Sequence, residues 1–416
     1  MTTAPEAARQ RRICMLVYGD TPTGLPPMVN HGASLSAAGY DVEIICIARQ
    51  SAPENAEVVS GLRITRLHVR SRRLFHALFG EATVFRGLAA VQYVTSYVEF
   101  LSKAVVAALR SRADVYEAND LPPLLAAVVA AKLRGKPVVY RAHELWSEAT
   151  PNVRFAAFWR FMERALVPRA DYVVTPEENR SRIYQTELGS RRPPITVRNC
   201  PPYRPPIASS RLPDELHRRG IRCSTIVLYQ GLIDSMRCIE EIAEATRFFN
   251  DGVVLVIMGT GYGKWANPTR ALAGYERIVV LPPVPYRELV PYTASADIGI
   301  LLYRNDCRNN YYCAPNKLFE YMMMGLPMIA ANYPGMLPLV EGGEVGLCVD
   351  PESAQAIAAA VNRLAADPER RERMRANGLR LAKGRYNWEV ESVPLLRLYG
   401  SLASTAPLTR DGAAIG

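Results

Sequence analysis

Short apolar runs recur along the chain, and polar or glycine-rich segments separate them. The run at 13–18 is followed by a helical pattern at 28–38 and a second apolar run at 42–47. Apolar runs of this length that alternate with helices predict a parallel sheet with helices on both faces. Further strands of the same sheet are expected at 64–69, 115–117, 137–140, 172–175 and 195–198.

The alternation stops at 199–206 and then begins again. This segment is dense in proline, which cannot continue a helix or a central strand, so we interpret it as a linker between domains. Beyond it, strands are expected at 225–229, 253–258, 278–281, 298–302, 328–331 and 346–349. A chain of 416 residues suits two cores. We therefore expect three units: a domain at 1–204, a second at 205–384, and a helical segment at 385–416.

Composition narrows the class of protein. Hydrophobic residues make up 49% and charged residues 22%, as in globular proteins. The net charge of +10 allows an anionic partner, but no basic block interleaved with aromatic residues indicates nucleic acid. The eight cysteines are scattered without metal-binding spacing, which favours free thiols in a reducing cytoplasm. No apolar run reaches the length of about 18 residues that predicts a membrane span, and residues 1–12 lack a signal core.

The segment 315–330 is the most informative local pattern. It predicts a short helix that begins at Pro315 and ends at Gly325, directly before a buried strand. The backbone N–H groups that such a start leaves free belong to Asn316, Lys317 and Leu318. Free amides and the helix macrodipole together favour a bound anion.

Asn316 and Glu320 lie one turn apart on the same face of this predicted helix. A phosphate at the helix start and a sugar hydroxyl against Glu320 would fit together, and a nucleotide-sugar presents both groups. The alternative is an ordinary amphipathic helix with a solvated glutamate.

The same residues resemble the donor-binding motif of retaining nucleotide-sugar glycosyltransferases of family 4, within glycosyl transferases group 1. A subgroup with a Pro-Asn-Lys-x-Phe-Glu-Tyr stretch is the most similar. The resemblance implies the GT-B fold, in which two Rossmann-like domains face each other across a cleft. It also implies that Glu320 holds the ribose hydroxyls and that the helix start receives the diphosphate. The family usually has an earlier glutamate as well, and Tyr312 stands at that position.

The loop after strand 225–229 contains Gly231 and ends at Arg237. In the resembled family a cation at this place clamps the donor diphosphate, and a guanidinium can grip two phosphate oxygens and stabilise the leaving group. A solvated arginine at a helix start is the alternative. Two departures from the family pattern stand out: an earlier arginine in this loop is missing, and Cys238 replaces a glycine.

Two further segments of the second half resemble donor contacts. Gly259 and Gly261 form a turn that would face the nucleotide or would simply join a strand to a helix. Val284 and Tyr286 lie in a segment that cups the base in the family. Tyr286 would either stack on the base or pack on the helix below it.

In the first half, His143 and Glu144 follow the strand at 137–140, at the sheet edge where open α/β sheets bind ligands. The resemblance implies that His143 bonds the sugar 6-hydroxyl, and that Glu144 holds the imidazole or touches the acceptor. Asp120 ends another strand at this edge, where it would bind acceptor or, as we expect, cap a helix that begins at Leu121.

The loop 19–24 also ends a strand of the first sheet. The resemblance places Thr23 and Gly24 near the acceptor. The helix that begins near 386–389 resembles the family helix that crosses back onto the first domain.

These features predict a retaining glycosyltransferase, hexosyl or other, that transfers a sugar from a nucleotide-diphosphate sugar to a soluble small molecule. Biosynthesis, including secondary metabolism, would be its setting. No cofactor and no metal ion are expected, because protein cations would stabilise the leaving diphosphate. The nucleotide, the sugar, the acceptor and the oligomeric state are left open by the sequence.

Two alternatives stay open. The first is a glycosyltransferase that acts on a lipid-linked or cell-surface glycan, because the stretch 69–79 places arginines beside leucine and phenylalanine and would allow peripheral membrane contact. The helix at about 83–109 is expected to pack internally. The second is a non-catalytic nucleotide-sugar-binding protein with a decayed site. A nicotinamide oxidoreductase is disfavoured because the dinucleotide glycine fingerprint is absent.

Overall fold

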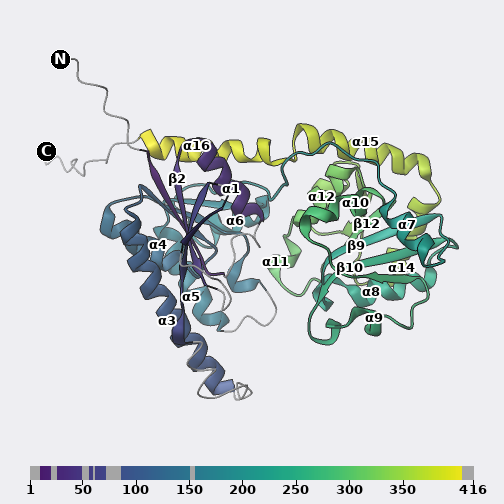
Figure 1. The fold of residues 1–416 in the computed structure, drawn as a ribbon, viewed down its shortest axis with the longest axis horizontal. Coiled ribbons are helices and arrows are strands. Elements are labelled where there is room, and N and C mark those ends of the chain that lie inside the picture. The colour runs from purple at the N-terminus through teal and green to yellow at the C-terminus, as the bar shows by residue number, and fades with distance from the viewer. Residues whose placement is uncertain are drawn as a thin grey trace, which may run out of the picture.

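The computed structural model describes residues 10–19, 26–48, 56–59, 61–71, 86–149 and 155–404. They form two α/β domains side by side, and 197–210 joins them without regular secondary structure (Figure 1). Each domain has a sheet of mainly parallel strands with helices on both faces. The predicted fold class is therefore confirmed.

The N-terminal sheet has eight strands in the order β3-β4-β2-β1-β5-β6-β7-β8. The strands are β1 (Arg12–Val17), β2 (Asp41–Ile47), β3 (Ala56–Val59), β4 (Leu62–Leu67), β5 (Val115–Asn119), β6 (Val138–Arg141), β7 (Tyr172–Thr175) and β8 (Ile195–Thr196). All neighbours pair in parallel except β3, which pairs antiparallel with β4 at the sheet edge. The sequence did not reveal β3, because four residues that include a glutamate carry little apolar signal.

The helices of this domain are α1 (Pro26–Ala37), α3 (Arg86–Ser111), α4 (Leu124–Arg134), α5 (Ala156–Leu166) and α6 (Glu178–Thr186), with short 3-10 turns η2 (Trp146–Glu148) and η3 (Val167–Arg169). Alternate residues of β1 point to opposite faces of the sheet. Cys14 and Leu16 pack with α3, α4 and α5, whereas Ile13, Met15 and Val17 pack with α1.

Helix α3 is not the internal packing helix that we expected. Tyr97 and Phe100 are buried in the domain core, but Val91, Val94 and Val98 are about half exposed. These valines are spaced three and four residues apart, so they share one face of the helix. In Figure 1 the N-terminal end of α3 extends beyond the rest of the domain. The expectation failed because an apolar helical face looks alike in sequence whether or not a neighbour covers it.

The C-terminal sheet has six parallel strands in the order β11-β10-β9-β12-β13-β14. They are β9 (Thr225–Ile233), β10 (Val253–Gly261), β11 (Ile278–Leu281), β12 (Ile298–Leu301), β13 (Met328–Ala331) and β14 (Gly346–Val349). The longer helices are α7 (Arg211–Arg218), α8 (Ile239–Ala245), α10 (Leu289–Ala294), α12 (Asn316–Met324), α14 (Ala354–Ala365) and α15 (Pro368–Gly384). The shorter ones are η4 (Ser235–Arg237), η5 (Thr246–Phe248), η6 (Gly263–Trp265), α9 (Pro268–Ala271), η7 (Tyr286–Glu288), α11 (Arg308–Tyr311) and α13 (Leu337–Val340).

The last helix, α16 (Trp388–Ser404), leaves the second domain and lies along the first (Figure 1). Leu395, Leu398 and Tyr399 are buried in the same cluster as β1 and α1. The indole Nε1 of Trp388 donates to Ser34 Oγ of α1 at 2.8 Å. The chain therefore connects the domains twice, once through 197–210 and once through α16.

Strands β9 and β10 stay paired well past the rest of the sheet, with Gly259 opposite Gly231. A Cβ at Gly259 would lie 1.7 Å from the Gly231 carbonyl oxygen. A Cβ at Gly261 would lie 1.8 Å from the Trp265 carbonyl oxygen. Backbone packing by itself thus demands glycine at both positions, whether or not a ligand approaches.

We expect Gly259→Ala to destabilise the protein by about 3 kcal/mol or more, because the added methyl group overlaps backbone that cannot move without separating β9 from β10. Urea denaturation measures the change. Gly274→Ala is the matched control: an added Cβ meets nothing within 4 Å there, so its effect should stay within about 1 kcal/mol. Equal stability of the two variants would contradict this packing argument.

Candidate functional site

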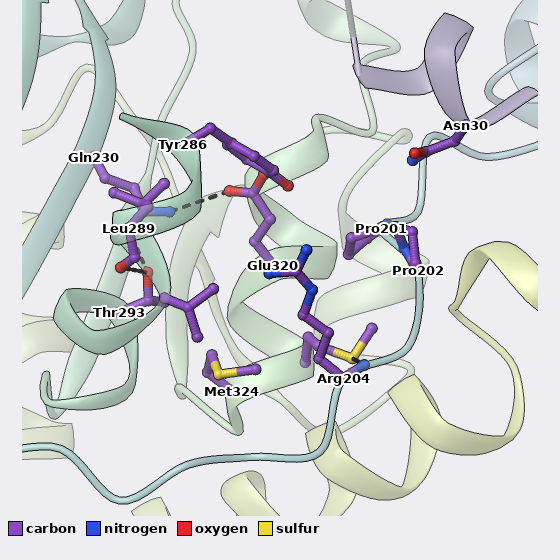
Figure 2. A pocket seen from close by; sticks show the side chains of 12 residues that line it. Asn30, Pro201, Pro202, Arg204, Gln230, Tyr286, Leu289, Thr293, Glu320 and Met324 are labelled. Atoms are coloured by element: carbon purple, nitrogen blue, oxygen red, sulfur yellow. Dashed lines mark hydrogen bonds between the residues drawn. The ribbon is translucent and has the colours of Figure 1, made fainter. Parts of the chain in front are cut away.

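A pocket lies where the two domains and their linker meet (Figure 2). Its lining residues come from α1, from the linker and from the C-terminal domain: Asn30, Pro201, Pro202, Arg204, Gln230, Tyr286, Leu289, Val290, Thr293, Glu320, Met323 and Met324. Leucine, valine, proline and methionine side chains make much of this wall apolar, and the Glu320 carboxylate points toward Tyr286 and Gln230 (Figure 2).

The Glu320 carboxylate is held by polar neighbours. Gln230 Nε2 donates to Glu320 Oε2 at 3.1 Å, and Gln230 Oε1 accepts from the Thr293 hydroxyl at 2.8 Å. The Tyr286 hydroxyl also bonds the carboxylate. Burial raises the pKa of Glu320 above its usual range, and Tyr286, Lys317 and Gln230 partly oppose the shift. A carboxylate fixed in this way can accept hydrogen bonds from a pair of ligand hydroxyls.

Tyr286 is half exposed and lines the pocket, so it does more than pack on the helix below it. Val284 does not line the pocket; its side chain packs against the cluster formed by β9, β10 and α7. Gln230 and Thr293 were missed at the sequence level. A polar residue at the end of the buried run 225–230 was the available signal for Gln230.

Helix α12 ends at Gly325 in the left-handed conformation, and Pro315 is its N-cap, one residue outside the predicted start. One amide differs from the expectation: the Leu318 N–H donates to the Pro315 carbonyl at 3.0 Å and is not free. This tight first turn leaves the amides of Asn316 and Lys317, which have no hydrogen-bond acceptor among the described residues. The free donors at the helix start are therefore two, not three.

Arg237 lies at the end of η4, with its guanidinium carbon 4.2 Å from the Tyr303 ring centre. Its Nη1 is buried and has no hydrogen-bond partner among the described residues. Burial lowers the pKa of Arg237, but Tyr303 and Asp234 outweigh burial and raise the pKa above its usual value. Cys238 follows with φ of 54°, a left-handed conformation that explains why a glycine would suit this position.

A chain of hydrogen bonds orients the side chain of His143. Its Nε2 lies 3.1 Å from Asn119 Oδ1, and Asn119 Nδ2 donates to Glu117 Oε1 at 2.9 Å. Because Asn119 presents its oxygen, Nε2 of His143 carries the proton and Nδ1 remains an acceptor. Burial and the nearby Arg141 lower the pKa of His143 to about 3. The imidazole is thus a neutral hydrogen-bond acceptor.

Asp120 does not cap a helix as we expected. Helix α4 begins at Leu124 behind Pro123, without a side-chain cap. Asp120 Oδ1 instead accepts from the backbone N–H groups of His143 at 2.8 Å and Glu144 at 3.3 Å. Burial and the Glu144 charge raise the pKa of Asp120 to about 8. Asp120 therefore fixes the loop that carries His143 and Glu144.

The Glu144 carboxylate lies within electrostatic reach of Arg237 in the other domain. Burial raises the pKa of Glu144, whereas Arg180 and Arg237 lower it. The loop after β6 and the loop after β9 therefore face each other across the domain boundary. Helix α11 of the second domain lies on the side that faces the first domain (Figure 1).

A second set of contacts, missed at the sequence level, ties the domains together beside this site. Arg180 of α6 donates from Nη1 to the His143 carbonyl at 2.8 Å and from Nη2 to the Asn309 carbonyl at 2.7 Å. Asn309 Oδ1 accepts from the Leu145 N–H at 3.0 Å. Tyr312, which stands at the family's glutamate position, packs against the core of the first domain. No local sequence pattern predicts the contacts of Asn309 with Arg180 and Leu145, because these partners are more than 100 residues apart.

Some predicted positions lie outside the described residues. These are Thr23, Gly24 and the part of 69–79 beyond Ser71. Within the part of the chain that is described, no group of three or more His, Cys, Asp or Glu side chains could hold a metal ion. No helix in those same ranges is long and apolar enough to cross a membrane.

Comparison with known proteins agrees with this architecture. Residues 29–200 match the family "Glycosyl transferase 4-like domain", and residues 227–367 match "Glycosyl transferases group 1". The chain carries the two domains of a GT-B glycosyltransferase. Its N-terminal glycosyltransferase domain holds His143, and its C-terminal domain holds Arg237 and Glu320.

Among curated proteins, the chain is 30% identical over 187 residues to alpha-D-kanosaminyltransferase of Streptomyces kanamyceticus, covering 44% of this chain and 47% of that protein. It is 25% identical over 211 residues to D-inositol 3-phosphate glycosyltransferase of Thermobifida fusca, covering 47% of each. The chain thus spans about half the length of these relatives.

Solved structures show the same fold over nearly the whole chain. Sucrose-phosphate synthase from Thermosynechococcus elongatus has a TM-score of 0.73 at 18% identity, covering 95% of this chain and all of that one. Anabaena HepE in complex with UDP and glucose has a TM-score of 0.68 at 15% identity, covering 94% of this chain and 100% of that one. At these identities the likeness concerns the fold alone.

We expect His143 to stay neutral from pH 5 to pH 8, because burial and Arg141 oppose its charged form. An exposed histidine titrates near pH 6.5. NMR titration of the imidazole carbons tests this, with His143→Gln to assign the signal. Below about pH 6.5 the His143 side chain takes up a proton in the unfolded chain but not in the folded protein. The contribution of His143 to the free energy of unfolding should therefore fall as the pH drops from about 6.5 toward 3. A midpoint near 6.5 for His143 in the folded protein would contradict the geometry described here.

Proposed function

We propose that this protein transfers a sugar from a nucleotide-diphosphate sugar to an acceptor hydroxyl and retains the anomeric configuration. The main support for this proposal is the position of Glu320, which lies in the interdomain pocket one turn after the start of α12 and its free amides. Arg237 lies nearby, and its buried Nη1 has no hydrogen-bond partner in the described part of the chain. A ribose against Glu320 and a diphosphate at the helix start would use both features at once.

The proposed chemistry divides between the two domains. Arg237 and the amides of Asn316 and Lys317 stabilise the charge that develops on the leaving diphosphate. The neutral His143 accepts a hydrogen bond from a hydroxyl of the transferred sugar through Nδ1. The bond from the anomeric carbon to the phosphate oxygen breaks with its electron pair on that oxygen. The acceptor oxygen bonds the same carbon from the same side and gives its proton to the leaving phosphate.

Protein cations supply the charge stabilisation in this scheme, so we propose that no metal ion takes part. For the acceptor we propose a soluble polar small molecule. The names of the curated relatives support this choice, since one is a glycosyltransferase for D-inositol 3-phosphate and another transfers kanosamine. Biosynthesis of a secondary metabolite in the cytoplasm fits such an acceptor.

We expect at least one of UDP, GDP, TDP and ADP to raise the melting temperature, because the pocket binds a nucleoside diphosphate. Glu320→Ala should remove most of that shift, since its carboxylate would bond the ribose hydroxyls. A thermal-shift series measures both. Glu372→Ala, an exposed position on α15, is the matched control and should respond like the wild type. If none of the four diphosphates stabilises the wild type, a decayed binding site explains the chain better.

A second candidate acceptor, a lipid-linked glycan at a membrane, is favoured by one specific observation. On α5, Phe158 is 43% and Phe161 68% exposed, and Arg160 and Arg164 of the same helix are exposed beside them. Exposed aromatic side chains flanked by cations suit the surface of an anionic bilayer. The exposed valine face of α3 belongs to the same domain.

If the acceptor is membrane-bound, the protein should float with vesicles that contain phosphatidylserine at low salt and dissociate at high salt. The double change Phe158→Ser and Phe161→Ser should abolish flotation, because it removes the apolar contact. Phe248→Ser is the matched control, since Phe248 is 47% exposed but belongs to the other domain. Absence of wild-type flotation would leave the soluble acceptor as the better proposal.

A further inference from the structure

The side chain of Lys317 is not bonded to any counter-charge among the described residues, although Glu320 and Asp234 lie within electrostatic reach. In the described part of the chain, its amine makes no hydrogen bond and no ion pair. It lies 4.5 Å from the Tyr229 ring centre and 5.9 Å from that of Tyr303. Glu320, one turn further along α12, bonds Gln230 and Tyr286 instead. A buried amine that rests on aromatic rings without a directly bonded anion is poorly compensated.

Arg237 shares the same aromatic support. Its guanidinium carbon lies 4.2 Å from the Tyr303 ring centre, so one ring contacts two cations. The two positive charges also repel each other, since Arg237 lowers the pKa of Lys317. Bringing like charges together in a half-buried place is costly unless an anion binds between them. The backbone amide of Lys317 at the helix start, which has no acceptor among the described residues, also favours a bound anion.

The loop after β9 makes room for this amine. Gly231 has φ of 124°, and a Cβ there would lie 3.2 Å from Lys317 Nζ. The next two residues, Leu232 and Ile233, carry no charge. The loop therefore offers a single cation, Arg237, and the space above Gly231 is filled by an amine from α12.

The geometry points to Lys317 as the second cation of the diphosphate site, reaching over Gly231 from α12 to face Arg237. This inference rests on the proposed function and adds a residue to its site. It accounts for the arginine that the sequence lacks in the β9 loop: the positive charge is supplied by a helix rather than by the loop. Lys317 would thus bond the ligand with its backbone amide and with its side chain.

The surroundings of Lys317 make its charge depend on the ligand. Burial and Arg237 lower the pKa of Lys317 to about 7, whereas Glu320, Asp234 and Cys313 raise it. The pKa values of the facing Tyr229, Tyr303 and Cys313 are raised, so these groups stay neutral up to pH 9. A diphosphate is fully ionised above a pH of about 6 to 7. Above pH 7, binding should therefore require Lys317 to take up a proton.

We expect Lys317→Met to weaken binding of the stabilising nucleoside diphosphate by roughly 10- to 100-fold at pH 7. Binding of the matching nucleoside, which has no phosphate, should stay unchanged. Wild-type affinity should fall by up to about tenfold per pH unit above 7, whereas Lys317→Arg, which keeps its charge, should bind without that slope. Isothermal titration calorimetry in two buffers of different ionisation enthalpy at pH 8 should show proton uptake by the wild type only.

Failure of this inference differs from failure of the proposed function. If the wild type binds no diphosphate, the proposed function falls. If wild type and Lys317→Met bind the diphosphate with equal affinity and equal proton uptake, Lys317 is not a phosphate cation, although the proposed function stands. Melting of the unliganded variants controls for folding, and Lys317→Met should be at least as stable as the wild type because it removes a poorly compensated charge.

Discussion

The hydroxyl of Tyr399 on α16 donates to the buried Glu117 of β5, and the arrangement of the first domain's site depends on this bond. Glu117 uses its other oxygen to orient Asn119, and Asn119 in turn fixes the proton of His143 on Nε2. The last helix of the chain thus sets the tautomer of a residue more than 250 positions earlier. The first residue of α16, Trp388, is buried in the same cluster as Tyr399 and bonds Ser34, so α16 is anchored on the first domain along its length.

Charge is distributed unequally between the two domains where they meet. The second domain contributes Arg237, Lys317 and the free amides at the start of α12. The first contributes a neutral His143, and Asp120, whose carboxyl holds loop amides rather than a ligand. An anionic group is therefore favoured on the second domain, and an uncharged hydroxyl is favoured on the first. This asymmetry agrees with a donor whose diphosphate binds the second domain and an acceptor hydroxyl that approaches from the first.

Local patterns predicted the fold because strands in wound parallel sheets are short apolar runs with breaks between them. The strands at 172–175, 278–281, 328–331 and 346–349 have the predicted ends, and the wound order followed from their alternation with helices. The same logic located Glu320 and Arg237, since the carboxyl ends of parallel strands lie at one edge. Strand β3 was missed because it pairs at the edge, where a mixed sequence suffices.

Contacts between distant parts of the chain were not predictable in this way. The role of Asp120 depends on the loop after β6, and that of Arg180 on a carbonyl in the other domain. Position 259 requires glycine because the Gly231 carbonyl of the neighbouring strand occupies the space that a side chain would need. The Leu318 amide is not free for a ligand, because it donates to the Pro315 carbonyl in a 3-10 bond that tightens the first turn of α12. Each depends on a partner that no spacing along the sequence identifies.

The energetics of the pocket bear on whether the site is active or decayed. Among the described residues, Arg237 Nη1 has no hydrogen-bond partner and the Lys317 amine bonds no anion, and without a ligand the Lys317 charge lowers stability. An apolar replacement at Lys317 would relieve that cost. The presence of both Arg237 and Lys317 near the start of α12 agrees with a site that binds an anion between them. Tyr312 is compatible with this view, because it follows α11 of the second domain and packs against the core of the first.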